Sequence, residues 1–340
     1  MVIGVVVVTY GAAGVIAPCL ESLFACTGAE LRIVVVDNAS PDGTVAVIEA
    51  WAQGRLRPTP QGLPFRPRPH GPVALVRADK TPEALSAGTV GLIRLPENRG
   101  FAAGVNAGLR CLQALPEVAH FWILNPDCMA VGHTASALLE CAGRLGRYGV
   151  IGGRVHYCAP DDMIQSEGGR VNFLTGVCVP FNLGRSGPDV PSPAAGQIDY
   201  VAGAHMLVSR AFLETAGPMP EDYFLFYEEV DWCLRRGELP LATCPEAVVY
   251  HHAGHSIGSA TLERGPSPLA AYFMARSKIR FIRRYRPLAL PFALAHSLLK
   301  ALRHLAKGHR AAARGMLRGT LGMKPDAEVL ARIGRRDLPG

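Results

Sequence analysis

The sequence predicts an α/β fold in which helices flank a mostly parallel sheet, followed by a basic helical extension. The sheet is indicated by runs of β-branched residues, such as residues 2–9, that alternate with stretches of helical periodicity. A strand–helix–strand order favours parallel pairing through right-handed crossovers. The extension is indicated by residues 276–318, which contain many Arg, Lys and His and no Asp or Glu.

The expected elements follow a regular order over the first half of the chain. Strands are expected at residues 2–9, 31–36, 90–95, 119–124 and 150–155, and helices at 16–25, 44–51, 101–115 and 136–147. Residues 52–90 interrupt this order with a proline-rich segment, which we interpret as an exposed insertion in the sheet domain. Residues 156–200 are rich in Gly and Pro and should form loops and short strands. Strands are expected again at 200–208 and 247–250, on either side of a helix at about 229–236.

These patterns predict one sheet domain over residues 1–265 and a helical extension over residues 266–340. The extension begins with a basic amphipathic helix at 269–284. Residues 288–305 are apolar but interrupted by Pro291, His296 and Lys300, which favours a helix lying at a membrane surface over one that spans it. A basic block can attract phosphate, anionic lipid or nucleic acid, and a simple solvated helix face is an equally good interpretation.

Composition narrows the class of protein. Hydrophobic residues make up 49% of the chain and charged residues 19%, which excludes general disorder. The nine cysteines show no metal-finger or disulfide spacing and indicate reduced thiols. The apolar N-terminus has no basic flank or cleavage site and is predicted to be a buried strand. We therefore expect a cytoplasmic protein, peripheral on the inner face of the membrane if the extension binds lipid.

Polar residues follow three of the expected strands, where open α/β sheets bind ligands. They are Thr9-Tyr10, Asp37-Asn38 and Asn125-Pro126-Asp127. A carboxylate at the position of Asp37 can accept hydrogen bonds from a ribose or a base. Asp127 can recruit Mg²⁺ or Mn²⁺ beside a diphosphate, whose oxygens supply further ligands. Each aspartate also has a purely structural interpretation, as a turn residue or a helix cap.

Three further segments combine chemistry-bearing residues. Residues 98–108 form a glycine-rich helix start that could hold anionic oxygen or simply pack tightly. In residues 223–232 an aromatic run leads into Glu228, Glu229 and Asp231. Burial against the aromatic residues would raise the pKa of a carboxylate and strengthen it as a base. The alternative is that these acidic residues simply cap the helix. His251, with His252 and His255, could complete a metal shell or lie in a solvated loop.

The order of these segments resembles the family-2 inverting glycosyltransferases, and within them the bacterial rhamnosyltransferase-like branch. The segments are VVVTY, VVVDNAS, NRGFAAGVNAG, WILNPD, VAGAHMLVSRAFLETAG, FLFYEEVDWCLRRG and VYHHAGHS. The resemblance covers about residues 2–285 outside the proline-rich insertion. It implies a GT-A type, Rossmann-like fold, a nucleotide-diphosphate sugar donor such as dTDP-rhamnose or a UDP-sugar, and Mg²⁺ or Mn²⁺.

The resemblance also implies roles for individual residues. Glu229 falls on the general base, with Glu228 and Asp231 in the same acidic group, and Asp127 and His251 fall on the metal ligands. Donor contacts fall on Thr9, Tyr10, Asp37, Asn38, Asn98, Gly100, Asn106, Asn125 and Gly203. The sequence departs from the family pattern at Gly11, where Asn is usual, at Glu229, where Asp is commoner, and at residues 217–222.

The resulting prediction is a single displacement with inversion, in which Glu229 takes the proton of an acceptor hydroxyl on a glycan or a lipid-linked acceptor. A glycosidase would need a second, opposed carboxylic acid. A nicotinamide dehydrogenase would need the glycine fingerprint that residues 11–14 lack. No nucleic-acid partner is expected, although the basic extension leaves one alternative: a protein with an inactive GT-A fold that binds anionic surfaces.

Overall fold

The structure is a computed structural model that describes residues 1–58, 65–66, 70–187, 189–194, 196–252 and 265–335. A ten-stranded sheet runs through its centre in the order β3-β4-β2-β1-β5-β11-β7-β12-β6, with β8 paired to β7. The strands are β1 (Val2–Thr9), β2 (Glu30–Asp37), β3 (Ala74–Val76), β4 (Thr89–Arg94), β5 (Val118–Leu124), β6 (Cys128–Ala130), β7 (Val150–Tyr157), β8 (Ile164–Ser166), β11 (His205–Ser209) and β12 (Leu241–His251). A separate hairpin pairs β9 (Gly169–Asn172) with β10 (Val177–Pro180).

The strand pairing confirms the mostly parallel sheet. Strand β1 pairs in parallel with β2 and β5, β2 with β4, β4 with β3, and β12 with β7. Strand β11 is antiparallel to both of its neighbours, β5 and β7. The carboxyl ends of β1, β2, β4 and β5 therefore meet at one edge of the sheet, where the sequence predicts that ligands bind.

Two apolar cores cover the two faces of the sheet. Because side chains alternate along a strand, Val5 and Val7 of β1 point into one core, and Val6 and Val8 point into the other. The first core is closed by α1 (Ile16–Ala25), α2 (Thr44–Ala52) and α4 (Thr134–Leu145), and the second by α3 (Phe101–Gln113), α5 (Arg210–Ala216) and α6 (Glu228–Leu234). Both faces are buried, which explains why the β1 sequence is apolar throughout.

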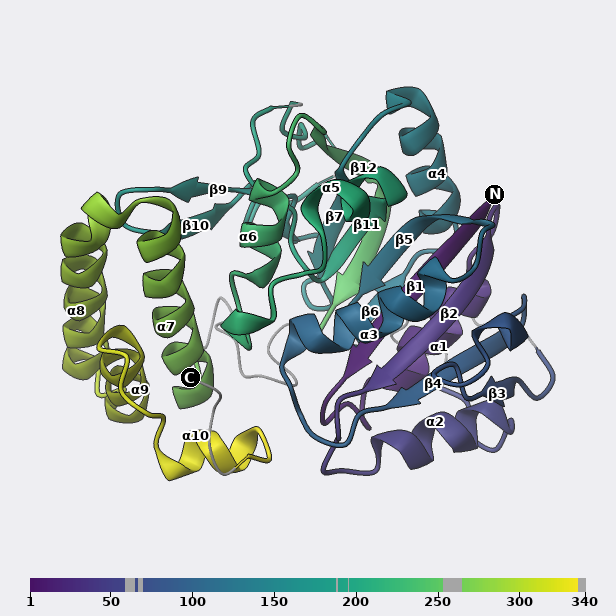
Figure 1. Cartoon of the computed structure of the whole chain (residues 1–340), viewed down its shortest axis with the longest axis horizontal. Helices are drawn as coiled ribbons and strands as arrows, with labels where there is room; N and C mark the ends of the chain where they lie inside the picture. Colours follow the sequence, from purple (N-terminus) through teal and green to yellow (C-terminus); the bar gives the residue numbers. More distant parts are fainter. Residues whose placement is uncertain (59–64, 67–69, 188, 195, 253–264, 336–340) are drawn as a thin grey trace.

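The C-terminal extension is helical, as expected. It comprises α7 (Pro268–Tyr285), α8 (Leu290–Ala306), α9 (Arg310–Thr320) and α10 (Ala327–Arg332), and Figure 1 shows α7, α8 and α9 standing together at one side of the sheet. Helix α7 is not separate from the sheet core, because Ile279, Phe281 and Ile282 pack within it. The predicted division at residue 265 stays a prediction. In the described part of the chain, no helix is long and apolar enough to cross a bilayer.

Some of the expected strand boundaries are wrong. Residues 200–204 do not continue β11, because Ala202 O accepts a hydrogen bond from His205 N and turns the chain immediately before the strand. Strand β12 begins at Leu241, six residues before the expected start at 247, and ends at His251. The region 52–90 contains a short edge strand, β3, so its second half belongs to the sheet. Much of its proline-rich part lies outside the described residues.

A buried carboxylate, Asp231, joins α6 to α7. It accepts hydrogen bonds from Tyr223 Oη at 2.7 Å, Arg235 Nε at 2.6 Å, Arg284 Nη1 at 2.5 Å and Tyr285 Oη at 2.8 Å. Burial alone would raise the pKa of Asp231, but the bonds from Arg235, Tyr223, Arg284 and Tyr285 bring that pKa below its usual value. All of its hydrogen-bonding capacity is used to hold the two helices together.

We expect Asp231→Asn to destabilise the fold by about 1.5–3 kcal/mol, because it weakens the charge-assisted hydrogen bonds that the buried carboxylate accepts. Thermal unfolding of the full chain measures this change. Asp222→Asn is the matched control, since Asp222 also pairs with Arg284, at 2.6 Å, but is exposed; its loss should cost at most about 1 kcal/mol. Equal losses in the two variants would contradict the structural role of Asp231.

Candidate active site at the sheet edge

The carboxyl ends of β1 and β2 are tied together by the first two candidate residues. Thr9 Oγ1 donates to Asp37 Oδ1 at 3.1 Å, and Ser40 N donates to Asp37 Oδ2 at 3.3 Å. Asp37 is buried, so part of its carboxylate shapes the turn that follows β2. The structural interpretation of Asp37 therefore holds alongside any role in binding.

Asn38 fixes the start of α3 against the end of β2. Its amide donates to Asn98 Oδ1 at 3.0 Å and to Gly100 O at 2.9 Å, and its Oδ1 accepts from Arg99 N at 3.0 Å. Gly100 adopts φ +90°, and a Cβ there would lie 2.4 Å from Phe224 O, so only glycine fits. This glycine is needed for close packing rather than for an exposed anion site.

A cavity of about 110 Å³, here called the edge cavity, opens at these strand ends. Five of the expected donor residues line it: Tyr10, Asn38, Asn98, Gly100 and Asn125. Asp127 lines it as well, together with Val8, Phe101, Pro126, Phe224, Leu225, Leu269, Arg332 and Ile333. The sequence-predicted residues at the ends of β1, β2 and β5 thus share one site.

The C-terminal segment forms part of the wall of the edge cavity, which sequence reasoning did not identify. Asn98 Nδ2 donates to Ile333 O at 3.2 Å, and Arg335 Nη1 donates to Asn98 O at 2.7 Å. A Cβ on Gly334 would lie 2.9 Å from Tyr10 Oη. No motif marks these residues, which lie more than 230 positions after Asn98 in the chain.

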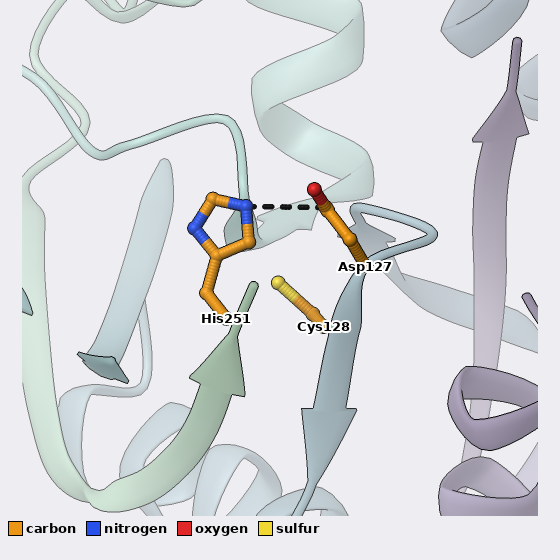
Figure 2. Close-up of side chains that lie close together, drawn as sticks. All are labelled: Asp127, Cys128 and His251. Carbon is orange, nitrogen blue, oxygen red and sulfur yellow. Dashed lines mark hydrogen bonds and ion pairs between the residues drawn. The ribbon is translucent and has the colours of Figure 1, made fainter. Parts of the chain in front are cut away.

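Two candidate metal ligands face each other beside this cavity. His251 Nε2 lies 3.1 Å from Asp127 Oδ1, as Figure 2 shows, and His251 Nδ1 lies 2.7 Å from Gln165 Oε1. With Nδ1–H donating to Gln165, the Nε2 lone pair points at the carboxylate. An imidazole nitrogen and a carboxylate oxygen held this close suit a divalent cation such as Mn²⁺ or Mg²⁺, so the residues fit the expected metal.

Cys128 lies within the same cluster, but its chemistry differs from that of the other two. Its Sγ is fully buried and donates to Ala204 O at 3.5 Å, and burial followed by the charge of Asp127 raises its thiol pKa well above the usual value. A protonated thiol is a poor ligand for a hard cation. Of the other histidines expected nearby, His252 N donates to Asp127 O at 2.9 Å, and His255 lies outside the described residues.

The aromatic turn at residues 224–227 has an unusual backbone. Phe224, Phe226 and Tyr227 adopt φ values of 68°, 65° and 72°, a region that bulky residues rarely occupy. Such conformations cost about 1–3 kcal/mol each and persist where surrounding contacts enforce them. Here Ser277 Oγ donates to Leu225 O at 2.8 Å and Tyr227 Oη donates to Gly176 O at 2.6 Å. The strain fixes where α6, and with it the acidic pair, begins.

The two glutamates at the start of α6 have different environments. Glu228 is buried, and its Oε2 has no hydrogen-bond partner among the described residues; burial and then the neighbouring Glu229 raise its pKa well above the usual value. Burial raises the pKa of Glu229 to about 7. Glu229 lines a second, larger cavity. A carboxylate that titrates near neutral pH and faces a cavity is suited to general-base catalysis.

Gly203 lies between the two cavities. A Cβ there would come within 3.4 Å of Phe101 Cε1 and 3.7 Å of Glu229 Cβ. The next residue, Ala204, accepts a hydrogen bond from Asn125 N at 3.0 Å. Residues 203–204 therefore link the surroundings of Glu229 to the turn that carries Asp127.

Two of the expected site residues are engaged elsewhere. Asn106 Nδ2 donates to Met219 O at 2.8 Å and to Glu221 Oε1 at 2.9 Å, and its Oδ1 accepts from Met219 N, so it anchors the loop that precedes α6. Asp231 is committed to the α6–α7 joint described above. Neither residue lines the edge cavity or the cavity that contains Glu229.

Known proteins similar to this chain are glycosyltransferases. Residues 4–69 match the family described as glycosyl transferase family 2. The chain is 25% identical over 280 residues to the N-acetylglucosaminyl-diphospho-decaprenol L-rhamnosyltransferases of two Mycobacterium tuberculosis strains, CDC 1551 / Oshkosh and H37Rv, covering 76% of this chain and 78% of each relative.

The fold is supported by one solved structure, and a second is similar at a lower score. GalNAc-T7, solved with UDP, GalNAc and Mn²⁺, aligns over 85% of this chain and 51% of its own, with a TM-score of 0.52 and 13% identity. A mannosyltransferase from Pyrobaculum calidifontis, solved with GDP-Man and Mn²⁺, aligns over 94% of this chain and 86% of its own, with a TM-score of 0.49 and 16% identity. This agrees with the GT-A type of fold that the sequence predicts.

We expect Asp127→Asn to weaken Mn²⁺ binding at least about tenfold, because it removes the anionic oxygen of the cluster. Cys128→Ser is the matched control within the same cluster and should bind Mn²⁺ nearly as well as the unaltered chain. Electron paramagnetic resonance of free Mn²⁺ during titration measures both affinities. If Cys128→Ser lost Mn²⁺ binding while Asp127→Asn retained it, the metal would be bound by the Cys128 thiolate instead.

Proposed function

We propose that the chain is a glycosyltransferase that moves a sugar from a nucleotide-diphosphate donor to a hydroxyl of a glycan or lipid-linked acceptor, as the match of residues 4–69 to glycosyl transferase family 2 supports. The observation that carries the proposal is the pairing of Asp127 with His251 at the sheet edge, which residues 203–204 link to the surroundings of the cavity-facing Glu229. A metal-binding pair and a carboxylate of raised pKa are the two components that such a transfer requires.

We assign the donor to the edge cavity. Tyr10 offers an aromatic ring and Asn125 a side-chain amide to a nucleoside and its diphosphate, while Asn38, Asn98 and Gly100 shape the wall through their mutual hydrogen bonds. The name of the mycobacterial relatives supports rhamnose as the transferred sugar. dTDP-rhamnose is therefore the first donor to test, with UDP-sugars as the comparison.

In the proposed reaction, Glu229 acts as the base. Its carboxylate takes the proton of the acceptor hydroxyl while that oxygen attacks C1 of the donor sugar from the face opposite the nucleotide. The bond between C1 and the diphosphate oxygen breaks, and the nucleoside diphosphate leaves with the electron pair. One displacement inverts the anomeric carbon, and protonated Glu229 returns its proton to solvent.

Asp127 and His251 are the proposed metal ligands, and Gln165 orients the imidazole ring. A bound Mg²⁺ or Mn²⁺ would neutralise negative charge on the diphosphate. Thr9, Asp37 and Asn38 hold the strand ends and the start of α3 in register around the donor. In this proposal Asn106 and Asp231 act indirectly, by fixing the two sides of the aromatic turn and α6.

The extension, residues 266–340, is proposed to keep the enzyme at a membrane surface on the cytoplasmic side. Its support is the set of exposed apolar side chains on α8, such as Phe292 and Leu302, within residues 276–318, which lack Asp and Glu. Flotation with vesicles containing anionic lipid tests this association.

The proposal predicts that Glu229→Gln lowers turnover at least about 100-fold while donor binding stays near normal, because only the proton acceptor is lost. Release of nucleoside diphosphate from dTDP-rhamnose or a UDP-sugar, in the presence of acceptor and Mn²⁺, measures turnover. Thermal shift with the same donors measures binding, since a ligand bound to the native state stabilises it.

Two matched variants sharpen this test. Glu214→Gln removes an exposed carboxylate on α5 and should leave turnover unchanged. Glu228→Gln removes the neighbouring buried carboxyl and should reduce turnover less than Glu229→Gln. Full turnover in Glu229→Gln would show that Glu229 is not the base. A folded chain that binds anionic vesicles but no nucleotide-sugar would favour the alternative of an inactive GT-A fold that binds anionic surfaces.

The raised pKa of Glu229 predicts a pH dependence of the acceptor reaction. Turnover at saturating donor, metal and acceptor should rise with pH up to about 7 and then level, because the base acts only when ionised. Glu229→Gln should lack this rise of turnover with pH.

Burial of Glu229 also disfavours its ionised form in the folded state. The folded chain therefore binds more protons than the unfolded one between the ordinary glutamate pKa of 4.5 and about 7. Thermal stability should fall across that window, and fall less in the glutamine variant.

A further inference from the structure

A second cavity, of about 300 Å³, lies between the β9–β10 hairpin, α6 and the C-terminal helices. We call it the helix cavity. Its lining combines Glu229 with apolar residues and with three cationic or potentially cationic side chains; the members outside α6 include Cys178, Tyr200, Met274, Lys278, His296, Lys300 and Met316. Its volume falls at the lower end of the range for small-molecule sites.

Lys278 is the unusual member of this lining. It is only 6% exposed, and its Nζ lies 3.3 Å from His296 Nδ1, an imidazole rather than a carboxylate. Burial, followed by the charge of Lys300, lowers the pKa of Lys278 to about 8. Within the described residues, no carboxylate forms an ion pair with Lys278 or Lys300. Lys278 is therefore a buried ammonium without an anion, which is costly, whereas the neighbouring Lys300 is exposed to solvent.

The charged side chains around Lys278 and His296 are mostly cationic. His296 has its pKa lowered by burial, then by Lys278, Lys300 and Arg303, so it is a neutral imidazole that accepts from Lys278. Among the lining residues the acidic one is Glu229, at the start of α6. The helix cavity therefore has an anion-attracting wall on α7 and α8 and a proton-accepting wall on α6.

Beyond the cation group, α8 presents an apolar surface. Phe292, Leu299 and Leu302 are exposed at helical spacing on this helix, and Leu288 immediately before it is 93% exposed. Basic residues, Arg303 and Lys307, follow on the same helix. An apolar surface beside cations suits an amphiphile whose anionic group adjoins a hydrocarbon chain at a membrane.

We propose that the helix cavity binds the diphosphate of a lipid-linked saccharide acceptor through Lys278 and Lys300, with its sugar directed toward Glu229 and its lipid along α8. The inference rests on the proposed function, because it takes Glu229 as the base for the acceptor hydroxyl. The order of chemical groups along the site, carboxylate, then cations, then apolar surface, matches the order sugar, diphosphate, hydrocarbon in such a molecule. His296 of α8 holds Lys278 of α7 in place through their 3.3 Å contact.

Farnesyl diphosphate is the probe that tests this site, used with the full chain and without divalent metal so that the metal cluster does not contribute. We expect saturable binding that is at least about tenfold tighter than that of farnesol or of inorganic pyrophosphate, because both the charge and the hydrocarbon are recognised. The double variant K278M/K300M should lose at least about tenfold in this affinity. Methionine keeps the length of the buried stem, which favours a folded chain.

Lys307→Met is the matched control, because Lys307 is an exposed lysine at the end of α8 outside the cavity lining; its affinity for farnesyl diphosphate should be unchanged. Unchanged binding in K278M/K300M would overturn the proposal. Equal affinity for pyrophosphate and farnesyl diphosphate would also overturn it, since it would indicate a site for free phosphate. Donor-dependent release of nucleoside diphosphate separates the two claims: retained release with no farnesyl diphosphate binding rejects this site alone, whereas absent release rejects the proposed function.

Discussion

The contact between the aromatic turn at residues 224–227 and the start of α3 is the constraint on which the rest of the site depends. Phe224 O accepts from Phe101 N at 3.0 Å and lies where any side chain on residue 100 would have to go. One surface of this turn faces the edge cavity through Phe224 and Leu225, and the other faces the helix cavity through Phe226 and Tyr227. The strained backbone is therefore a partition between two sites, and Glu229 follows it directly.

This partition is supported mainly by the C-terminal extension. Ser277 of α7 donates to Leu225 O, Phe273 stacks on Phe224 with ring centroids 4.8 Å apart, and Arg284 reaches Asp231 in α6. Helix α7, which the sequence predicts to be basic and amphipathic, therefore has two different faces. Its buried face stabilises the turn beside the acidic pair, and its cationic residues near α8 face the helix cavity.

The sheet and its polar strand ends could be predicted from the sequence because they follow from local patterns. The apolar runs before Thr9, Asp37 and Asn125 define strands, and parallel strands must bring their carboxyl ends together. The cavity walls supplied by Ile333 and Lys278 could not be predicted, because they depend on how distant helices return to the sheet and no local signal marks them. Asn106 shows a second limit: a conspicuous asparagine in a glycine-rich segment can serve to anchor a neighbouring loop. The proposed roles of Glu229, Asp127 and His251 stay predictions that the experiments above address.

The return of residues 333–335 to the edge cavity also bears on how the protein can be handled. Ile333, Gly334 and Arg335 contact Asn98 and Tyr10, whereas Met1 is exposed at the amino end of β1, the opposite end of that strand from Thr9. A label placed next to residues 333–335 would therefore lie beside the cavity wall, whereas one placed near Met1 would lie at the far edge of the sheet. Labels for ligand-binding measurements are better placed near the start of β1.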